Sequence, residues 1–195
     1  MSSFSEIVPA GRTLPRPDGA LLVRTVPSPV GPLALAVSAV GLMQLHFGSF
    51  EVSATGLVTS EAARSRNASI RLVAGFMESA VRQVDAYFAG TLRTFDIALD
   101  LRGTPFQLRV WQALRAIPYG EKSTYGEVAR SLGDIHLARA VGAATGANPL
   151  AIVVPCHRLV GSDGDLTGFA GGIRVKQALL HHESQATAPD LFGGF

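Results

Sequence analysis

Residues Gly103 to Pro149 read "GTPFQLRVWQALRAIPYGEKSTYGEVARSLGDIHLARAVGAATGANP". Apolar residues recur here at helical spacing, and Pro and Gly interrupt the pattern at short intervals, which indicates several short helices. Thr104 can cap a helix whose first position is Pro105, because the proline nitrogen needs no hydrogen-bond partner there. That first helix should end before Pro118. The stretch therefore predicts a mostly helical domain.

The middle of this stretch predicts two further helices. Thr124 and Glu127 have the spacing of a capping box, so a second helix should begin there and end near Leu132. After a tight turn at residues 133–135, a third helix is expected over residues 136–147. Two short helices joined by such a turn are typical of a helix-turn-helix, although plain helical cores show the same outline.

The third predicted helix consists mostly of Ala and Gly, with Arg139 as its one charged side chain. Small residues let a helix backbone approach another surface closely. Two interpretations are open. The helix either packs tightly inside the domain or lies in a DNA groove, where Arg139 would act as a wedge between unstacked bases.

Upstream of the helical stretch the pattern is β-like. ALLVRTVPS, GPLALAVSA and LMQLHFG are apolar runs separated by turn residues, which is typical of an antiparallel meander. Residues 49–66 read as a polar loop, residues 69–88 as a helix with Gly90 as its C-cap, and TFDIALDL (94–101) as one more strand. The expected organisation is a flexible arm (1–19), an α/β scaffold domain (20–101), a mostly α domain (102–186) and a short tail (187–195).

Composition excludes several classes of protein. The chain is 47% hydrophobic and 16% charged, as in folded proteins, and its formal net charge of +2 does not by itself indicate nucleic-acid binding. With one cysteine, an internal disulfide and a zinc site built on several cysteines are impossible. No apolar run approaches ~18 residues, and the start of the sequence lacks the pattern of a signal peptide. We expect a cytoplasmic protein with no membrane contact.

The single cysteine, Cys156, lies in the segment IVVPCHRLVG at residues 152–161. Pro155 disfavours a helix at Val154, so the aliphatic run is expected to form a strand that ends at the thiol. A lone cysteine is commonly an inert, buried, small hydrophobic residue. A reactive thiol held at the end of a strand is the alternative.

Two neighbours favour the reactive alternative. His157 and Arg158 can lower the pKa of the thiol, and Glu183 is a candidate carboxylate to orient His157. His46 and His136 are expected to be structural residues. Five arginines are expected to lie mostly on a solvated face: Arg109, Arg115, Arg130, Arg158 and Arg174.

The motif PCHRLVG, followed by TGFAGGIRVKQALLHHE at residues 167–183, closely resembles the active-site block of the O6-alkylguanine-DNA alkyltransferases, the methylated-DNA–protein-cysteine methyltransferases. The likeness extends upstream through GTPFQLRVWQALRAIPYGEKSTYGEVARSLG and ARAVGAATGANP, from about Gly103 to Glu183 without an evident gap. It implies a ribonuclease H-like N-terminal domain and a C-terminal alkyltransferase domain with a winged helix-turn-helix-like motif. It also implies a monomeric DNA-repair protein that acts once, without metal or organic cofactor.

The resemblance implies specific roles for the residues around the thiol. Cys156 matches the alkyl acceptor, His157 the histidine that activates it through a water, and Glu183 the glutamate that orients this histidine. Asn148 matches the asparagine that shapes the active-site turn. The implied substrate is O6-alkylguanine in double-stranded DNA. O4-alkylthymine is a possible second substrate.

For DNA binding, the resemblance implies that Arg139 fills the gap left by a flipped nucleotide. Tyr125 matches the tyrosine at the flipped base and its 3′ phosphate. Ala138, Ala140 and Gly142 lie on the same helix as Arg139 and are expected at the DNA surface.

For the substrate pocket, the resemblance implies a backbone carbonyl from Val154 and backbone donors around Ala170, with Pro155 and Trp111 as further pocket residues. Phe169 departs from the family, which commonly has tyrosine at this position. The hydroxyl that would assist the leaving oxygen is therefore missing, and slower transfer is expected.

Two other functions, and one further partner, are open alternatives to this prediction. A Cys–His hydrolase would use the same nucleophile with turnover, and a non-catalytic reader of alkylated DNA would need no cysteine. In the tail, Asp190-Leu191-Phe192 resembles the core of peptides that bind bacterial sliding clamps, whereas docking of the tail onto the domain is the alternative.

Overall fold

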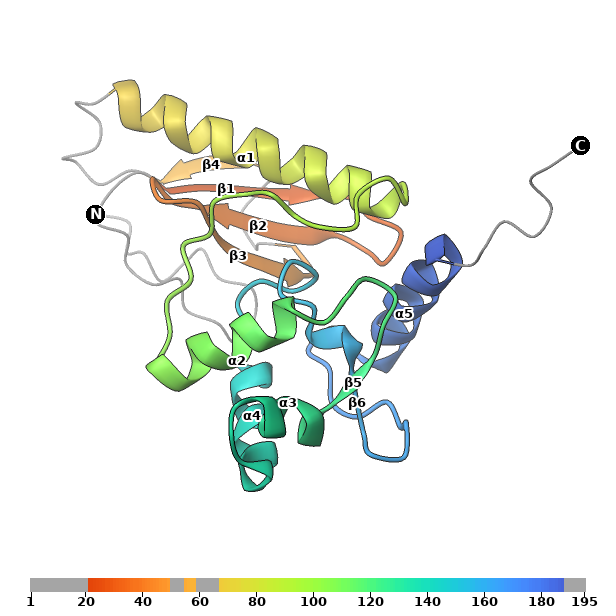
Figure 1. Cartoon of the computed structure of the whole chain (residues 1–195). Helices are drawn as coiled ribbons and strands as arrows, with labels where there is room; N and C mark the ends of the chain where they lie inside the picture. Colours follow the sequence, from red (N-terminus) through yellow and green to blue (C-terminus); the bar gives the residue numbers. More distant parts are fainter. Residues whose placement is uncertain (1–20, 50–54, 59–66, 188–195) are drawn as a thin grey trace, which may run out of the picture.

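The computed structural model describes residues 21–49, 55–58 and 67–187 (Figure 1). The predicted N-terminal arm, and residues 188–195 of the predicted tail with the Asp190-Leu191-Phe192 motif, lie outside these residues. Within the described part of the chain, no helix is long and apolar enough to span a membrane.

The N-terminal half is a four-stranded antiparallel sheet with the strand order β3-β2-β1-β4. The predicted meander is confirmed, but the predicted loop at residues 49–66 contains a strand, which pairs with β1 and becomes an edge of the sheet. The strands are β1 (Leu21–Val26), β2 (Leu33–Val37), β3 (Leu42–Phe47) and β4 (Thr55–Val58).

Helix α1 (Asn67–Phe88) lies along one face of this sheet (Figure 1). Its buried residues recur every three or four positions, so one apolar stripe faces the strands: Val73, Met77, Ala80, Val84 and Tyr87. The predicted C-cap is also found, because Gly90 adopts a φ of 74° just after the last turn. Such a left-handed conformation favours glycine.

The predicted strand at residues 94–101 is wrong. This segment runs beside β3 but makes a single bridge, between Leu42 and Leu99. Part of its backbone is instead bound by a side chain of α1, since Gln83 donates to the Asp96 carbonyl at 2.7 Å and accepts from the Asp96 N–H at 2.8 Å. The alternating pattern reflects one face packed on the core, not a continuous ladder.

The C-terminal half is mostly helical, as predicted. It contains α2 (Pro105–Arg115), α3 (Tyr125–Ser131), α4 (Ala138–Gly146) and α5 (Ile173–Thr187), with a short 3₁₀ turn, η2 (Ile135–Leu137), before α4. A two-residue parallel pair, β5 (Ser123–Thr124) and β6 (Leu159–Val160), completes the domain.

Local capping chemistry explains where these helices begin. Thr104 and Gln107 form a reciprocal capping box at α2, with Pro105 at the first helical position. Thr124 and Glu127 form a second box at α3. Both predicted starts are therefore confirmed.

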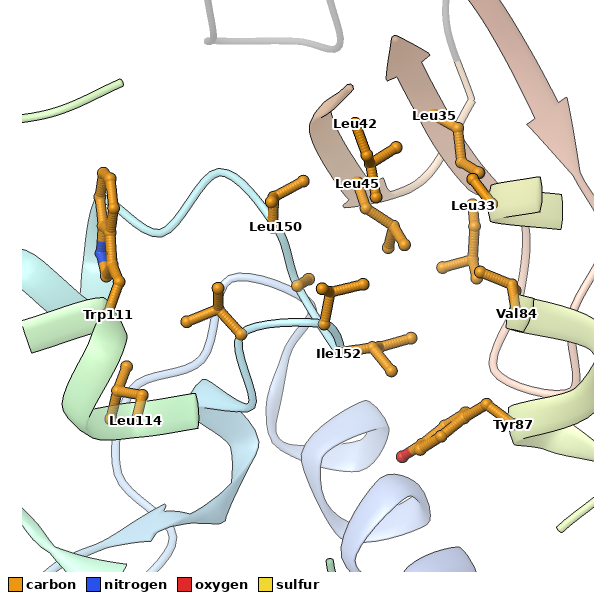
Figure 2. Packing of buried hydrophobic residues seen from close by; sticks show 14 of the residues in the cluster. Leu33, Leu35, Leu42, Leu45, Val84, Tyr87, Trp111, Leu114, Leu150 and Ile152 are labelled. Carbon is orange, nitrogen blue, oxygen red and sulfur yellow. The ribbon is translucent and has the colours of Figure 1, made fainter. Parts of the chain in front are cut away.

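The two halves share one hydrophobic core. Leu150 and Ile152 lie between Trp111 and Leu114 of α2 on one side and the leucines of the sheet on the other (Figure 2). Backbone hydrogen bonds join the halves directly, because the Leu45 N–H donates to Pro149 at 2.9 Å and the Leu45 carbonyl accepts from Ala151 at 2.9 Å. Strand β3 therefore fixes the chain just ahead of the cysteine.

Candidate active site

Cys156 begins a short 3₁₀ helix, η3 (Cys156–Arg158), and does not follow a strand. The predicted strand is wrong because the preceding residues form tight turns, in which the Val154 N–H donates to Leu150 and the Cys156 N–H donates to Val154. Ile152 has a φ of 72°, a costly backbone conformation for a β-branched residue. Its side chain is buried in the shared core, which holds this turn in place (Figure 2).

Asn148 connects this turn to the sulfur. Its Nδ2 donates to the Val154 carbonyl at 2.8 Å and lies 3.2 Å from the Cys156 Sγ, and its Oδ1 accepts from the Leu150 N–H at 2.9 Å. The side chain is buried. One amide therefore fixes both the backbone of the turn and the position of the thiol.

The 3₁₀ turn directs the side chain of His157 into the interior, where it is fully buried. Its Nε2 lies 2.8 Å from Glu183 Oε1, so Nε2 carries the proton that the carboxylate accepts. Burial lowers the pKa of His157, although the hydrogen bond and charge of Glu183 oppose the shift. Nδ1 makes no hydrogen bond to any described residue. The histidine is thus a neutral base with its second nitrogen available.

Glu183 is the centre of a buried hydrogen-bond network. It accepts from Tyr87 at 2.9 Å, from the Gly120 N–H at 3.0 Å, and from Arg158 Nε and Nη2 at 2.9 and 3.0 Å, in addition to His157. Burial alone would raise the pKa of Glu183, but the hydrogen bonds from His157 and Arg158 outweigh it and hold the pKa far below the ordinary value. The carboxylate therefore stays ionised.

The predicted solvated position of Arg158 is wrong. Its side chain is buried, and it donates to the Ile117 carbonyl as well as to both oxygens of Glu183. Sequence spacing could not show this, because the carboxylate that neutralises Arg158 comes from α5, which follows much later in the chain.

This cluster predicts a loss of stability in acid. The folded-state pKa of His157 lies below its ordinary 6.5 and that of Glu183 below its ordinary 4.5, so both groups bind fewer protons in the folded state than in the unfolded state. The free energy of unfolding should therefore decrease as the pH falls through each ordinary value. Urea midpoints measured across pH should fall below about pH 6.5 and fall again below about pH 4.5. In His157→Gln, which cannot titrate at this position, the first step should be reduced; an unchanged first step contradicts the assignment.

A cavity of about 480 Å³ opens beside the sulfur. Helices α3 and α4, the turn before Cys156, the segment before α5 and strand β3 all contribute to its walls. The lining residues are His46, Phe47, Tyr125, Gly142, Thr145, Gly146, Asn148, Ala151, Cys156, Thr167, Gly168, Phe169 and Ala170.

Several predicted pocket residues lie elsewhere. Trp111 does not line this cavity, because its ring is buried in the core and its indole N–H donates to the Ala144 carbonyl at 2.9 Å. The side chains of Val154 and Pro155 are buried outside the cavity wall, although the Val154 carbonyl is bound by Asn148.

Sequence reasoning missed three residues near the thiol. His46 and Phe47 come from β3 of the N-terminal sheet, and only the tertiary fold places them at the cavity. Lys176 is fully buried and donates to the Thr167 carbonyl at 2.9 Å, and burial lowers its pKa while the nearby Cys156 opposes the shift. In the sequence, the indication that Lys176 lies near the thiol is its position within the motif TGFAGGIRVKQALLHHE.

Helix α4 packs inside the domain on one face, as the first of the two interpretations has it, and leaves its other face exposed. Its buried face, with Val141, Ala144 and Thr145, packs on α2, whereas Arg139 and Ala140 are exposed on the other face. Ala138 and Gly142 are partly exposed, and Gly142 also lines the cavity. The helix therefore presents an exposed face that carries one arginine, and its residue Gly142 lines the cavity that contains the thiol.

Comparisons with known proteins agree with this architecture. The model of the 6-O-methylguanine DNA methyltransferase DNA-binding domain matches residues 105–185, and the model of the ribonuclease-like domain of the same proteins matches residues 21–101. A Mycobacterium tuberculosis methylated-DNA–protein-cysteine methyltransferase is 48% identical over 170 residues, which cover 86% of this chain and 95% of the relative. A Methanosarcina acetivorans protein of the same name is 43% identical over 160 residues, which cover 80% and 94%.

Solved structures show the same likeness. The crystal structure of the Mycobacterium tuberculosis O6-methylguanine methyltransferase has a TM-score of 0.69 and 46% identity, covering 88% of this chain and 97% of that one. The Mycobacterium tuberculosis OGT in complex with DNA has a TM-score of 0.68 and 47% identity, covering 87% and 96%. The chain belongs to the family of the 6-O-methylguanine DNA methyltransferases, the methylated-DNA–protein-cysteine methyltransferases.

Proposed function

We propose that this protein repairs O6-alkylguanine in double-stranded DNA by transferring the alkyl group irreversibly to Cys156. The observation that carries the proposal is the buried arrangement of Asn148, His157 and Glu183 around a thiol that faces a substrate-sized cavity. Its relatives are methylated-DNA–protein-cysteine methyltransferases, and one neighbour was solved with DNA.

The first step is removal of the thiol proton. Neutral His157 can accept it at Nδ1 through a water, while Glu183 accepts from Nε2 and stabilises the imidazolium that forms. The ionised state of Glu183 suits this role, because the carboxylate offsets the positive charge within the protein. Asn148 donates toward the sulfur and favours its thiolate.

In the second step the thiolate attacks the alkyl carbon in line with the carbon–oxygen bond. An S–C bond forms, the C–O bond breaks, and its electron pair leaves with guanine, which regains a proton from the imidazolium through water. The product is a thioether that no side chain in the cavity can cleave. Each molecule should therefore act once.

The guanine edge is inaccessible inside a duplex, so the nucleotide must first be extruded, which costs a few kcal/mol. The exposed, small-residue face of α4 supports a role in which this helix approaches the DNA, with Ala138, Ala140 and Gly142 close to the backbone. Tyr125 lines the cavity, which supports a contact between its ring and the flipped base. Arg139 would fill the gap in the base stack.

Arg139→Ala is expected to slow transfer from duplex DNA by roughly 10- to 100-fold, because the flipped state loses the side chain that fills the stack. Single-turnover rates on duplex DNA test this effect. Single-stranded DNA with the same lesion serves as the control and should be affected much less, since its base is already unstacked. An equal loss on both substrates would instead indicate a defect at the thiol.

Phe169→Tyr is expected to raise the single-turnover rate by roughly fivefold to tenfold, since one additional hydrogen bond to the leaving oxygen contributes about 1 kcal/mol. Phe169 lines the cavity, so the new hydroxyl has access to the substrate. The rate constant for methyl transfer, measured with DNA in excess, is the readout. A rate that stays the same or falls means that another donor already serves the leaving group.

The stoichiometry of methyl removal separates this function from the two alternatives. With O6-methylguanine duplex in large excess, we expect one methyl group lost from DNA per protein molecule and then no further reaction. A Cys–His hydrolase would turn over, and a non-catalytic reader would bind the lesion without removing the methyl group. We also propose that the protein acts as a monomer, which sedimentation in the presence of this duplex tests.

A further inference from the structure

The N-terminal sheet contributes an aromatic side chain to the wall of the alkyl-transfer cavity. Phe47 is the last residue of β3, and it lines the same cavity as Cys156 and Phe169. Its ring centroid lies 5.3 Å from that of Phe169, with the two rings tilted by 56°. Part of the cavity wall is thus a pair of aromatic rings from the two halves of the protein.

Phe47 also packs directly on the backbone of the segment that contains Phe169. A Cβ atom added to Gly171 would lie 2.6 Å from a carbon of the Phe47 ring, so only glycine leaves room for the ring. The segment at residues 167–172 has no regular secondary structure. Its backbone hydrogen bonds join residues at most four positions apart, except for the one that Lys176 Nζ donates to the Thr167 carbonyl. The position of Phe169 therefore depends strongly on its contact with Phe47.

Strand β3 fixes both sides of the cavity. Two residues before Phe47, the backbone of Leu45 is hydrogen-bonded to Pro149 and Ala151, which lead directly into the turn of Cys156. One short strand thus contacts both the segment that leads to the sulfur and the aromatic ring of Phe169. The distance between the two sets the space available to the alkyl group.

We propose that Phe47 is a specificity-determining residue, which limits the size of the alkyl group by holding Phe169 and its segment against the cavity. The inference rests on the proposed alkyl transfer to Cys156. A methyl group needs little room beyond the reacting carbon, whereas a benzyl group places a whole ring against this wall. Without the Phe47 ring, Phe169 can move outward and the cavity can accept the larger group.

The test compares transfer from duplex DNA containing O6-methylguanine with transfer from the same duplex containing O6-benzylguanine. Phe47→Ala is expected to raise the benzyl-to-methyl ratio of single-turnover rate constants at least about tenfold. Phe47→Leu should give an intermediate ratio, and Phe47→Trp a ratio below that of the unchanged protein.

Phe76→Ala is the matched control. Phe76 is a partly buried phenylalanine that packs on the same core from α1, and it does not line the cavity. It should lower stability without changing the benzyl-to-methyl ratio. A ratio that is unchanged or lower in Phe47→Ala, or in Phe47→Leu should the alanine variant fail to fold, overturns the inference. Absence of methyl transfer by the unchanged protein overturns the proposed function instead.

Discussion

Glu183→Ala is expected to destabilise the protein by about 3–5 kcal/mol and to abolish methyl transfer. The substitution leaves the buried guanidinium of Arg158 without its carboxylate and removes the acceptor for Tyr87 and for His157 Nε2. An uncompensated buried charge is among the most destabilising changes in a folded protein. The loss of transfer follows because His157 then lacks the group that stabilises its protonated form.

Urea unfolding and single-turnover methyl transfer, measured on the same preparation, test both parts of this expectation. Glu78→Ala is a suitable control, because Glu78 forms a solvent-exposed ion pair with Arg24 at 3.4 Å and should cost no more than about 1 kcal/mol. Glu183→Gln should retain more of the fold than the alanine variant but still transfer poorly. Full transfer by either Glu183 variant would contradict the role of the carboxylate.

Cys156→Ala is expected to reduce methyl transfer below detection while leaving DNA binding nearly unchanged. The sulfur is the group that forms the new bond, and no other cysteine is present in the chain. Under the proposed function, DNA affinity should depend chiefly on contacts to phosphates and on Arg139, which this substitution does not alter. Because the side chain is partly exposed and small, little stability should be lost.

Fluorescence anisotropy with duplex DNA and a parallel transfer assay measure these two properties of Cys156→Ala. Cys156→Ser is the closer control, because it keeps the volume but supplies a hydroxyl that is far less acidic than a thiol. Methyl transfer by either variant would show that another residue accepts the alkyl group. Loss of DNA binding would show that the thiol turn shapes the DNA surface as well.

Local chemistry explains which parts of the fold the sequence predicts well. Both capping boxes, at Thr104 and Thr124, involve residues three positions apart, so their helices could be placed without knowledge of the tertiary structure. The meander and the stripe of α1 follow from apolar periodicity in the same way. The motif around Cys156 identified the reactive residue through its resemblance to a family.

Contacts between distant segments explain the errors. Residues 94–101 alternate like a strand, but Gln83 of α1 takes up part of their backbone hydrogen bonding. The aliphatic run before Cys156 turns back on itself because Leu150 and Ile152 are anchored in the core between the two halves. Arg158 is buried only because Glu183 of α5 is there to neutralise it.

The same argument applies to the cavity. His46 and Phe47 belong to a sheet that seemed remote from the thiol in the sequence, and no local pattern indicates that β3 ends at the active site. Hydrogen bonds from Leu45 to the segment before Cys156 bring them there. The N-terminal domain, predicted as a scaffold, therefore contributes directly to the cavity wall.

The most direct test of the central claim is the mass of the intact protein after incubation with duplex DNA that contains one O6-methylguanine, followed by mapping of its peptides. We predict a gain equal to one CH₂ group, because a methyl group replaces the thiol proton, confined to the peptide that contains Cys156. The DNA should be left with unmodified guanine. Removal of the methyl group from DNA without any gain in protein mass, or a gain on a different residue, would contradict the account.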